Sequence, residues 1–141
     1  MTLDVERVEE HRFVGRNERG ARVQIGRKGQ EGTFSPTELL QLAVAGCAAV
    51  TGEALILRRI GDEAPIRAEV SARQRPDAHE LDGIDVRFDL DLSALDADGV
   101  AELAATVDRA VDRLCTVSRT LRKGIPVRET YGEDAAPTSP A

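Results

Sequence analysis

The feature that most constrains the fold of this chain is a long apolar segment from residue 36 to residue 60. Between Leu39 and Ala49 its only polar side chain is Gln41, so a helix formed here is apolar on nearly every face and has to be surrounded. A single small sheet covers only one side of such a helix. Small residues would let another helix approach closely: Ala43, Ala45, Gly46, Ala48 and Ala49. We therefore predict a homodimer, in which the equivalent helix of a second subunit covers this central, buried helix.

Both ends of the helix carry sequence signals. Ser35 is a favoured N-cap residue, Pro36 suits the first helical position, and Glu38 can complete a capping box with Ser35. Gly61 is suited to end the helix. The sequence therefore predicts one helix from Pro36 to Ile60, roughly 38 Å long at about 1.5 Å per residue.

The other elements follow from periodicity. Alternating apolar and polar residues predict strands at 3–8, 12–14, 21–25, 66–73, 86–92 and 125–131. Glycine and asparagine at 15–20 favour a hairpin connection there. Apolar residues at spacings of 3 and 4 predict a second helix from Ala97 to Leu114, and a short helical turn is expected at 117–123. This order predicts an α+β fold with a mostly antiparallel sheet.

Length and charge narrow the possible functions. The 141 residues suit one domain, which we expect to span residues 1–131, with a disordered tail at 132–141. The net charge of −6, without a basic stripe, argues against nucleic acid as a partner. We find no stretch approaching the roughly 18 apolar residues of a membrane span and no targeting segment, so we expect a cytoplasmic protein with no membrane partner. The two cysteines and two histidines have no metal-like spacing, and no metal or other cofactor is expected.

The two cysteines, Cys47 and Cys115, lie in apolar helical settings. Each could be a small buried hydrophobic residue, which is how free cysteine commonly behaves. Alternatively, the two could form a peroxide-reducing pair, in which one thiol is oxidised to sulfenic acid and the other condenses with it to a disulfide. Cys115 lies between a helix and a helical turn, where a helix N-terminus could lower the pKa of its thiol.

A cysteine reacts as a nucleophile in its ionised form, the thiolate. A thiol with the ordinary pKa near 8.5 is only about 3% ionised at pH 7, so a reactive cysteine usually has a cation nearby. Cys47 lies beyond the first helical turn, where the helix dipole acts, and has no charged residue one turn away. The hairpin at the N-terminus is rich in arginine, and Arg16, at the expected bend, could project over the helix. Arg16 could equally be an ordinary solvated turn residue.

Three segments together resemble the OsmC/Ohr family of osmotically inducible and organic hydroperoxide resistance proteins. They are residues 13–20 (Phe-Val-Gly-Arg-Asn through Gly20), residues 35–47 (Ser-Pro-Thr-Glu-Leu-Leu through Gly46-Cys47), and residues 114–127 (Leu-Cys-Thr-Val-Ser-Arg-Thr-Leu through Gly-Ile-Pro-Val). With the order of elements, the resemblance covers residues 1 to about 131. Each segment alone is a weak signal, and the combination is specific.

The resemblance implies an intertwined homodimer that reduces hydroperoxides without metal, haem or flavin. Cys47 matches the peroxidatic cysteine, Cys115 the resolving cysteine, and Arg16 the arginine that stabilises the thiolate. A dithiol, in the best-known members a lipoylated protein, would then reduce the disulfide.

One position departs from the family pattern. The established peroxidases have a glutamate directly after the proline, where this chain has Thr37. Glu38 lies about 180° round the helix from Cys47, whereas position 37 lies about 80° away, at about 100° per residue. The capping box accounts for Glu38 without catalysis, so we do not assign it the glutamate's role. The chain more closely resembles the broader OsmC-like subgroup.

The leading hypothesis is therefore a cytoplasmic, dimeric thiol peroxidase acting on organic hydroperoxides. The alternative is a redox-sensing or ligand-binding OsmC-like dimer whose cysteines change state without efficient turnover. A purely structural role for both cysteines is the third possibility.

Overall fold

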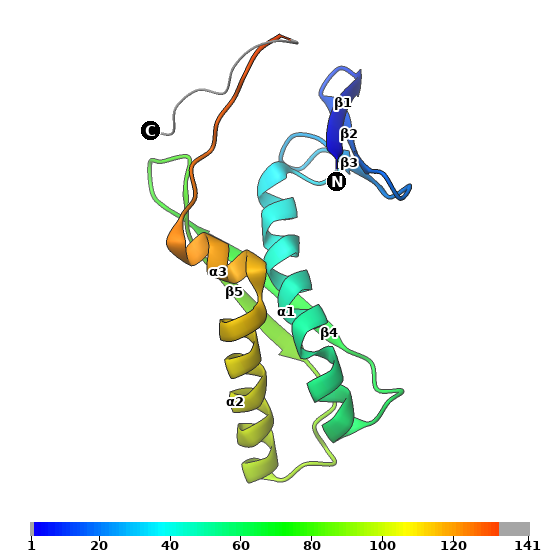
Figure 1. Cartoon of the computed structure of the whole chain (residues 1–141), viewed down its shortest axis with the longest axis vertical. Coiled ribbons are helices and arrows are strands. Elements are labelled where there is room, and N and C mark those ends of the chain that lie inside the picture. Colours follow the sequence, from blue (N-terminus) through cyan, green and yellow to red (C-terminus); the bar gives the residue numbers. More distant parts are fainter. Residues whose placement is uncertain (1, 133–141) are drawn as a thin grey trace. The chain divides into compact units, whose positions relative to one another are not determined.

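The computed structural model describes residues 2–132, which group into two compact units (Figure 1). The first unit comprises the chain up to residue 46 together with residues 66–90, and the second comprises residues 47–65 and the chain from residue 91. Antiparallel sheets and helices occur together, which confirms the predicted α+β class. The predicted disordered tail, residues 132–141, lies outside the described residues apart from Gly132.

The first unit opens with a three-stranded antiparallel sheet. Its strands are β1 (Leu3–Glu9), β2 (Arg12–Asn17) and β3 (Arg22–Ile25), in the order β1-β2-β3. The three predicted strands are confirmed.

The predicted hairpin connection at 15–20 was placed too early, because β2 continues to Asn17. Gly15 is a strand residue: a Cβ there would lie 3.1 Å from Cγ1 of Val23, so the glycine permits close packing rather than a bend. The turn is made by Gly20, whose φ of 95° favours glycine. Arg16 therefore lies within β2, opposite Asp4 of β1, and not at the bend.

The first unit also contains a hairpin formed by β4 (Arg67–Gln74) and β5 (Leu81–Asp89). The two strands pair antiparallel, with Val70 opposite Val86. The sequence pattern predicted both strands, although β5 begins several residues before the expected start at residue 86. Gly83, which precedes the expected start of this strand, is paired with Arg73 in the ladder.

Helix α1 spans Pro36–Ile60, as predicted, and Figure 1 shows it as one uninterrupted helix. Its N-terminus is a capping box: the Ser35 N–H donates to Oε1 of Glu38 at 2.8 Å, and the Glu38 N–H donates to Oγ of Ser35 at 3.2 Å. These hydrogen bonds, first that of the Ser35 backbone and then that of its side chain, lower the pKa of Glu38. Gly61, with a φ of 113°, ends the helix.

In a single chain α1 is only partly covered. The buried side chains are those of Val44, Ala45, Ala48 and Ile56. Leu42 is 44% exposed and Val50 is 80% exposed. The prediction of a fully enclosed helix is thus not met within one chain, because the described elements cover only part of its apolar surface.

Helix α1 is also long and apolar enough, by length and composition, to cross a membrane. The expectation that no segment approaches a membrane span was therefore wrong. The core helices of soluble proteins can have the same length and composition, so this property alone does not place the chain in a membrane.

The second unit contains α2 (Ala97–Leu114) and α3 (Thr116–Lys123) beside the C-terminal part of α1. Asp96 caps α2 by accepting a hydrogen bond from the Gly99 N–H at 2.8 Å. Gly52 of α1 lets α2 approach closely, since a Cβ there would lie 3.2 Å from Cγ1 of Val107. The unit buries Ala48, Ile56, Leu103, Val107 and Cys115.

The predicted closing strand at 125–131 is wrong: the structure has no strand in this stretch of the described chain. Its large apolar side chains, Ile125, Val127 and Tyr131, are exposed. A strand needs another strand to take up its N–H and C=O groups, and alternation in the sequence does not supply that partner.

We predict that Ser35→Ala lowers the free energy of unfolding by about 1 kcal/mol, because the first turn of α1 loses a buried side-chain acceptor. Urea denaturation measures the change. Ser71→Ala, at an exposed strand position, is the matched control and should change stability by less than about 0.5 kcal/mol. Equal effects of the two substitutions would contradict the role given to the capping box.

Candidate functional site

The structure brings the two cysteines together within the second unit. Cys47 lies on α1, and Cys115 lies at the junction of α2 and α3. Both are free thiols, and the side chain of Cys47 is hydrogen bonded to that of Cys115. Cys115 has no solvent-accessible surface, whereas Cys47 is partly exposed.

The backbone at Cys115 explains why a helix break occurs there. Its φ of −73° and ψ of 100° are extended, so the residue ends α2 and is the N-cap of α3. Its N–H donates to the carbonyl of Val111 at 3.0 Å, and its carbonyl accepts from the N–H of Arg119 at 3.0 Å. Cys115 is thus held by a helix on each side, and its sulfur lies at the start of the second one.

Two opposing effects act on the Cys115 thiol. Burial raises its pKa, and this is the largest single effect. The hydrogen bond with Cys47 lowers the pKa, as do hydrogen bonds with the Ser118 hydroxyl and with the backbone N–H groups of Ser118 and Val117. Together they outweigh burial, so the pKa of Cys115 lies below its usual value. This outcome agrees with the expectation that a helix N-terminus acts on this thiol.

Ser118 contributes to this site, and its role was missed in the sequence. The Cys115 thiol donates to Oγ of Ser118 at 3.3 Å. Ser118 lies three positions after Cys115, which is the spacing between an N-cap residue and the third residue of a helix. A cysteine at an N-cap followed three positions later by a serine is the signal that could have identified the contact.

Arg16 is occupied by two carboxylates of the first sheet. Its Nε and Nη2 lie 3.0 and 2.9 Å from Oδ1 of Asp4, and Nη2 lies 3.6 Å from Oε2 of Glu6. Hydrogen bonding and charge attraction from Asp4, with a smaller contribution from Glu6, raise the pKa of Arg16. Arg16 belongs to the first unit and Cys47 to the second, so the pairing of the two stays a prediction.

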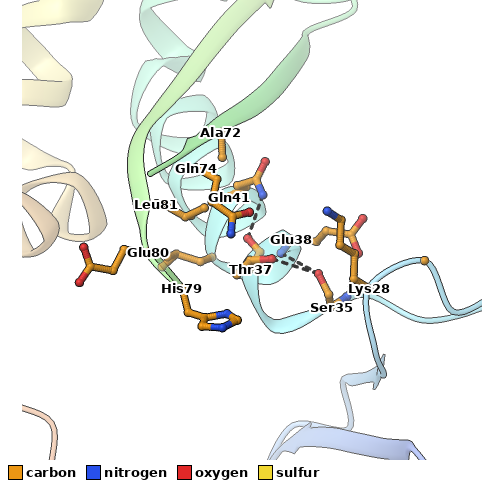
Figure 2. A pocket seen from close by; sticks show the side chains of 12 residues that line it. Lys28, Ser35, Thr37, Glu38, Gln41, Ala72, Gln74, His79, Glu80 and Leu81 are labelled. Atoms are coloured by element: carbon orange, nitrogen blue, oxygen red, sulfur yellow. Dashed lines mark hydrogen bonds between the residues drawn. The ribbon is translucent and has the colours of Figure 1, made fainter. Parts of the chain in front are cut away.

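A cavity of about 820 Å³ adjoins the start of α1 in the first unit (Figure 2). Glu38 and Thr37 line it, and the β4–β5 hairpin contributes His79 and Glu80. The Glu38 side chain is held in the capping box, which agrees with a structural interpretation of this residue. Both signs of charge occur in the cavity wall, so it favours neither an anion nor a cation.

Among residues 2–132, no three His, Cys, Asp or Glu side chains converge in a way that could hold a metal ion. The two adjoining thiols, one partly accessible and one buried, can themselves carry out chemistry. Such a pair can pass between dithiol and disulfide when one sulfur is oxidised and the other condenses with it.

The family model for OsmC-like proteins matches residues 29–130 of this chain. The chain belongs to the OsmC-like family. The family resemblance is thereby confirmed, and two of its three segments, residues 35–47 and 114–127, lie within the matched range, whereas residues 13–20 precede it. The matched range includes both cysteines and all three helices of the described structure.

Relatives and solved structures agree with this assignment. An uncharacterized protein of Mycobacterium tuberculosis is 38% identical over 125 residues, covering 89% of this chain and 91% of that protein. An OsmC-like protein of Mycoplasma pneumoniae has a TM-score of 0.64 at 12% identity, with 86% of each chain covered. A hypothetical protein of Aquifex aeolicus has a TM-score of 0.61 at 16% identity, with 87% of each chain covered. These structures confirm the OsmC-like fold.

The difference in access between the two thiols gives a prediction. In the folded OsmC-like protein at pH 7, iodoacetamide should modify Cys47 much faster than Cys115, because only Cys47 is accessible. Peptide mass spectrometry after timed quenching measures both rates. Unfolding in urea should remove the difference, and the Cys47→Ser variant should stay almost unmodified while folded. Equal rates in the folded protein would contradict the described burial of Cys115.

Proposed function

We propose that this OsmC-like protein is a thiol peroxidase that reduces organic hydroperoxides through Cys47 and Cys115. The observation that carries the proposal is the contact between the two thiols in a chain of this family. Two cysteines in contact need no large rearrangement to form a disulfide. A purely structural pair of cysteines would not require one of them to be accessible and the other to be buried in a hydrogen bond with Ser118.

The difference in exposure supports Cys47 as the residue of the first step. Its thiolate attacks the outer oxygen of the hydroperoxide, the O–O bond breaks, and the alkoxide leaves and takes a proton to become the alcohol. Cys47 is now a sulfenic acid. The thiolate of Cys115 attacks the Cys47 sulfur, hydroxide leaves and is protonated to water, and a disulfide forms. Hydrogen bonds that favour the thiolate of Cys115 serve this second step.

A dithiol closes the cycle by reducing the disulfide, and its own two thiols are oxidised to a disulfide. No metal or other cofactor takes part in this sequence. Arg16 is the proposed source of positive charge at Cys47. That role requires Arg16 to meet Cys47 while it is paired with Asp4 and Glu6, or to exchange those partners for the thiolate.

The working protein in this proposal is a homodimer in the cytoplasm. A single chain exposes large apolar side chains on β1, on α1 and in the segment after α3. Val5, Val50 and Val127 are representative, each more than half exposed. Burying apolar surface contributes about 25 cal/mol per Å², so a second copy that covers these side chains would gain considerable stability.

Peroxide consumption tests the proposed activity. Stopped-flow measurement with cumene hydroperoxide and a regenerating dithiol should show turnover by the wild type and none by Cys47→Ser. Cys115→Ser should retain one round of oxidation and lose the disulfide. Oxidation of the wild type without turnover would favour the redox sensor instead, and intact thiols after peroxide treatment would contradict both functions.

Sedimentation tests the dimer. Val50→Arg places a charge on the exposed apolar part of α1 and should shift the protein from dimer to monomer. Asp62→Arg, at an exposed position just beyond the helix, is the matched control and should leave the dimer intact. A wild-type protein that sediments as a monomer at micromolar concentration would contradict this part of the proposal.

A further inference from the structure

Ser118 and the start of α3 form an arrangement that the peroxide reaction does not explain. Cys115 is fully buried, yet its thiol donates a hydrogen bond to the Ser118 hydroxyl at 3.3 Å. A buried neutral thiol requires little hydrogen bonding, because it behaves as a small hydrophobic group. The Ser118 hydroxyl accepts from the thiol, and by rotating it can donate to the sulfur when the sulfur carries negative charge.

The moment at which Cys115 must carry that charge is the opening of the disulfide. In thiol–disulfide exchange the attacking thiolate bonds to one sulfur and the other sulfur departs as a thiolate. The sulfur whose thiolate is better stabilised departs more readily. A hydrogen bond from the Ser118 hydroxyl would stabilise the Cys115 thiolate, and the contact between these two side chains does not depend on Cys47 being a thiol.

The solvent exposure of the two sulfurs also favours attack at Cys47. The attacking thiolate must reach the sulfur from the side opposite the S–S bond. Cys115 has no accessible surface, so this approach is closed, whereas Cys47 is partly exposed. Attack at Cys47 releases the Cys115 sulfur in place, where the Ser118 hydroxyl already contacts it.

We propose that the reductant opens the Cys47–Cys115 disulfide at Cys47, and that Ser118 is a positioning residue that holds the departing sulfur of Cys115. The inference rests on the proposed function for its disulfide. It adds the site of attack and a role for Ser118.

The proposed reduction of the disulfide has two exchange steps. One thiolate of a dithiol bonds to the Cys47 sulfur, the Cys47–Cys115 bond breaks, and Cys115 leaves with the electron pair as a thiolate. The second thiolate of the dithiol attacks its own partner sulfur, which releases the Cys47 thiolate and closes the dithiol into a disulfide. The two protons of the dithiol end on Cys47 and Cys115, which are reduced by two electrons in all.

Trapping the mixed disulfide with 2-mercaptoethanol identifies the sulfur that the reductant attacks. The disulfide is made with diamide, so the test does not depend on peroxide turnover. The oxidised protein is mixed with 2-mercaptoethanol, quenched at short times with N-ethylmaleimide in denaturing urea, which exposes Cys115 to the reagent, and mapped by mass spectrometry. Mercaptoethanol on Cys47 with maleimide on Cys115 is expected. Mercaptoethanol on Cys115 would overturn the proposal, as would the failure of diamide to form the disulfide within the folded chain.

Substitution tests the role of Ser118. The Ser118→Ala variant should slow opening of the diamide-made disulfide roughly three- to tenfold, and its Cys115 thiol should ionise at higher pH than in the wild type. Ser118→Thr keeps a hydroxyl and should restore both quantities. A rate and an ionisation profile unchanged in Ser118→Ala, with the fold intact by circular dichroism, would overturn the role of Ser118. Correct trapping without peroxide turnover would contradict the peroxidase and leave the site of attack established.

Discussion

The proposed chemistry of this protein depends on the hydrogen bonding of one buried sulfur. Cys115 lies where α2 ends and α3 begins, and its side chain there hydrogen bonds with Ser118 of α3. The same break places the sulfur against Cys47 of α1. Burial opposes ionisation of this thiol and the hydrogen bonds favour it, and the hydrogen bonds prevail. A buried thiol whose pKa lies below its usual value suits a resolving cysteine, because it reacts with a neighbouring sulfur rather than with solvent.

Much of the fold could be predicted because the decisive signals are local. The limits of α1 follow from Ser35, Glu38 and Gly61, whose effects act within one helical turn. The strand pattern of β4 is equally local. The prediction of the hairpin turn was wrong because glycine can serve two purposes, a turn or close packing. Gly15 permits close packing in β2 and does not form a turn. Arg16 therefore lies in the strand, whereas the prediction placed it at the bend.

The site was predictable in part. The contact of Cys47 with Cys115 followed only from the family resemblance, because 67 residues between them (48–114) leave their approach to the tertiary fold. Ser118 belonged to a quoted motif but was given no role. The ion pairs of Arg16 could not be foreseen, since the cross-strand position of Asp4 depends on the register of β1 against β2. The strand expected at 125–131 failed for a related reason, because strand pairing is a property of two segments.

The most direct test of the account is disulfide mapping after one equivalent of cumene hydroperoxide, with denaturing gels to separate linked from unlinked chains. Oxidation within each chain, with Cys47 joined to Cys115 and the loss of two thiol hydrogens, is the predicted result. Sulfinic acid on Cys47 beside a free Cys115 thiol, or a disulfide that joins two chains, would contradict the central claim that these two sulfurs act as one redox pair.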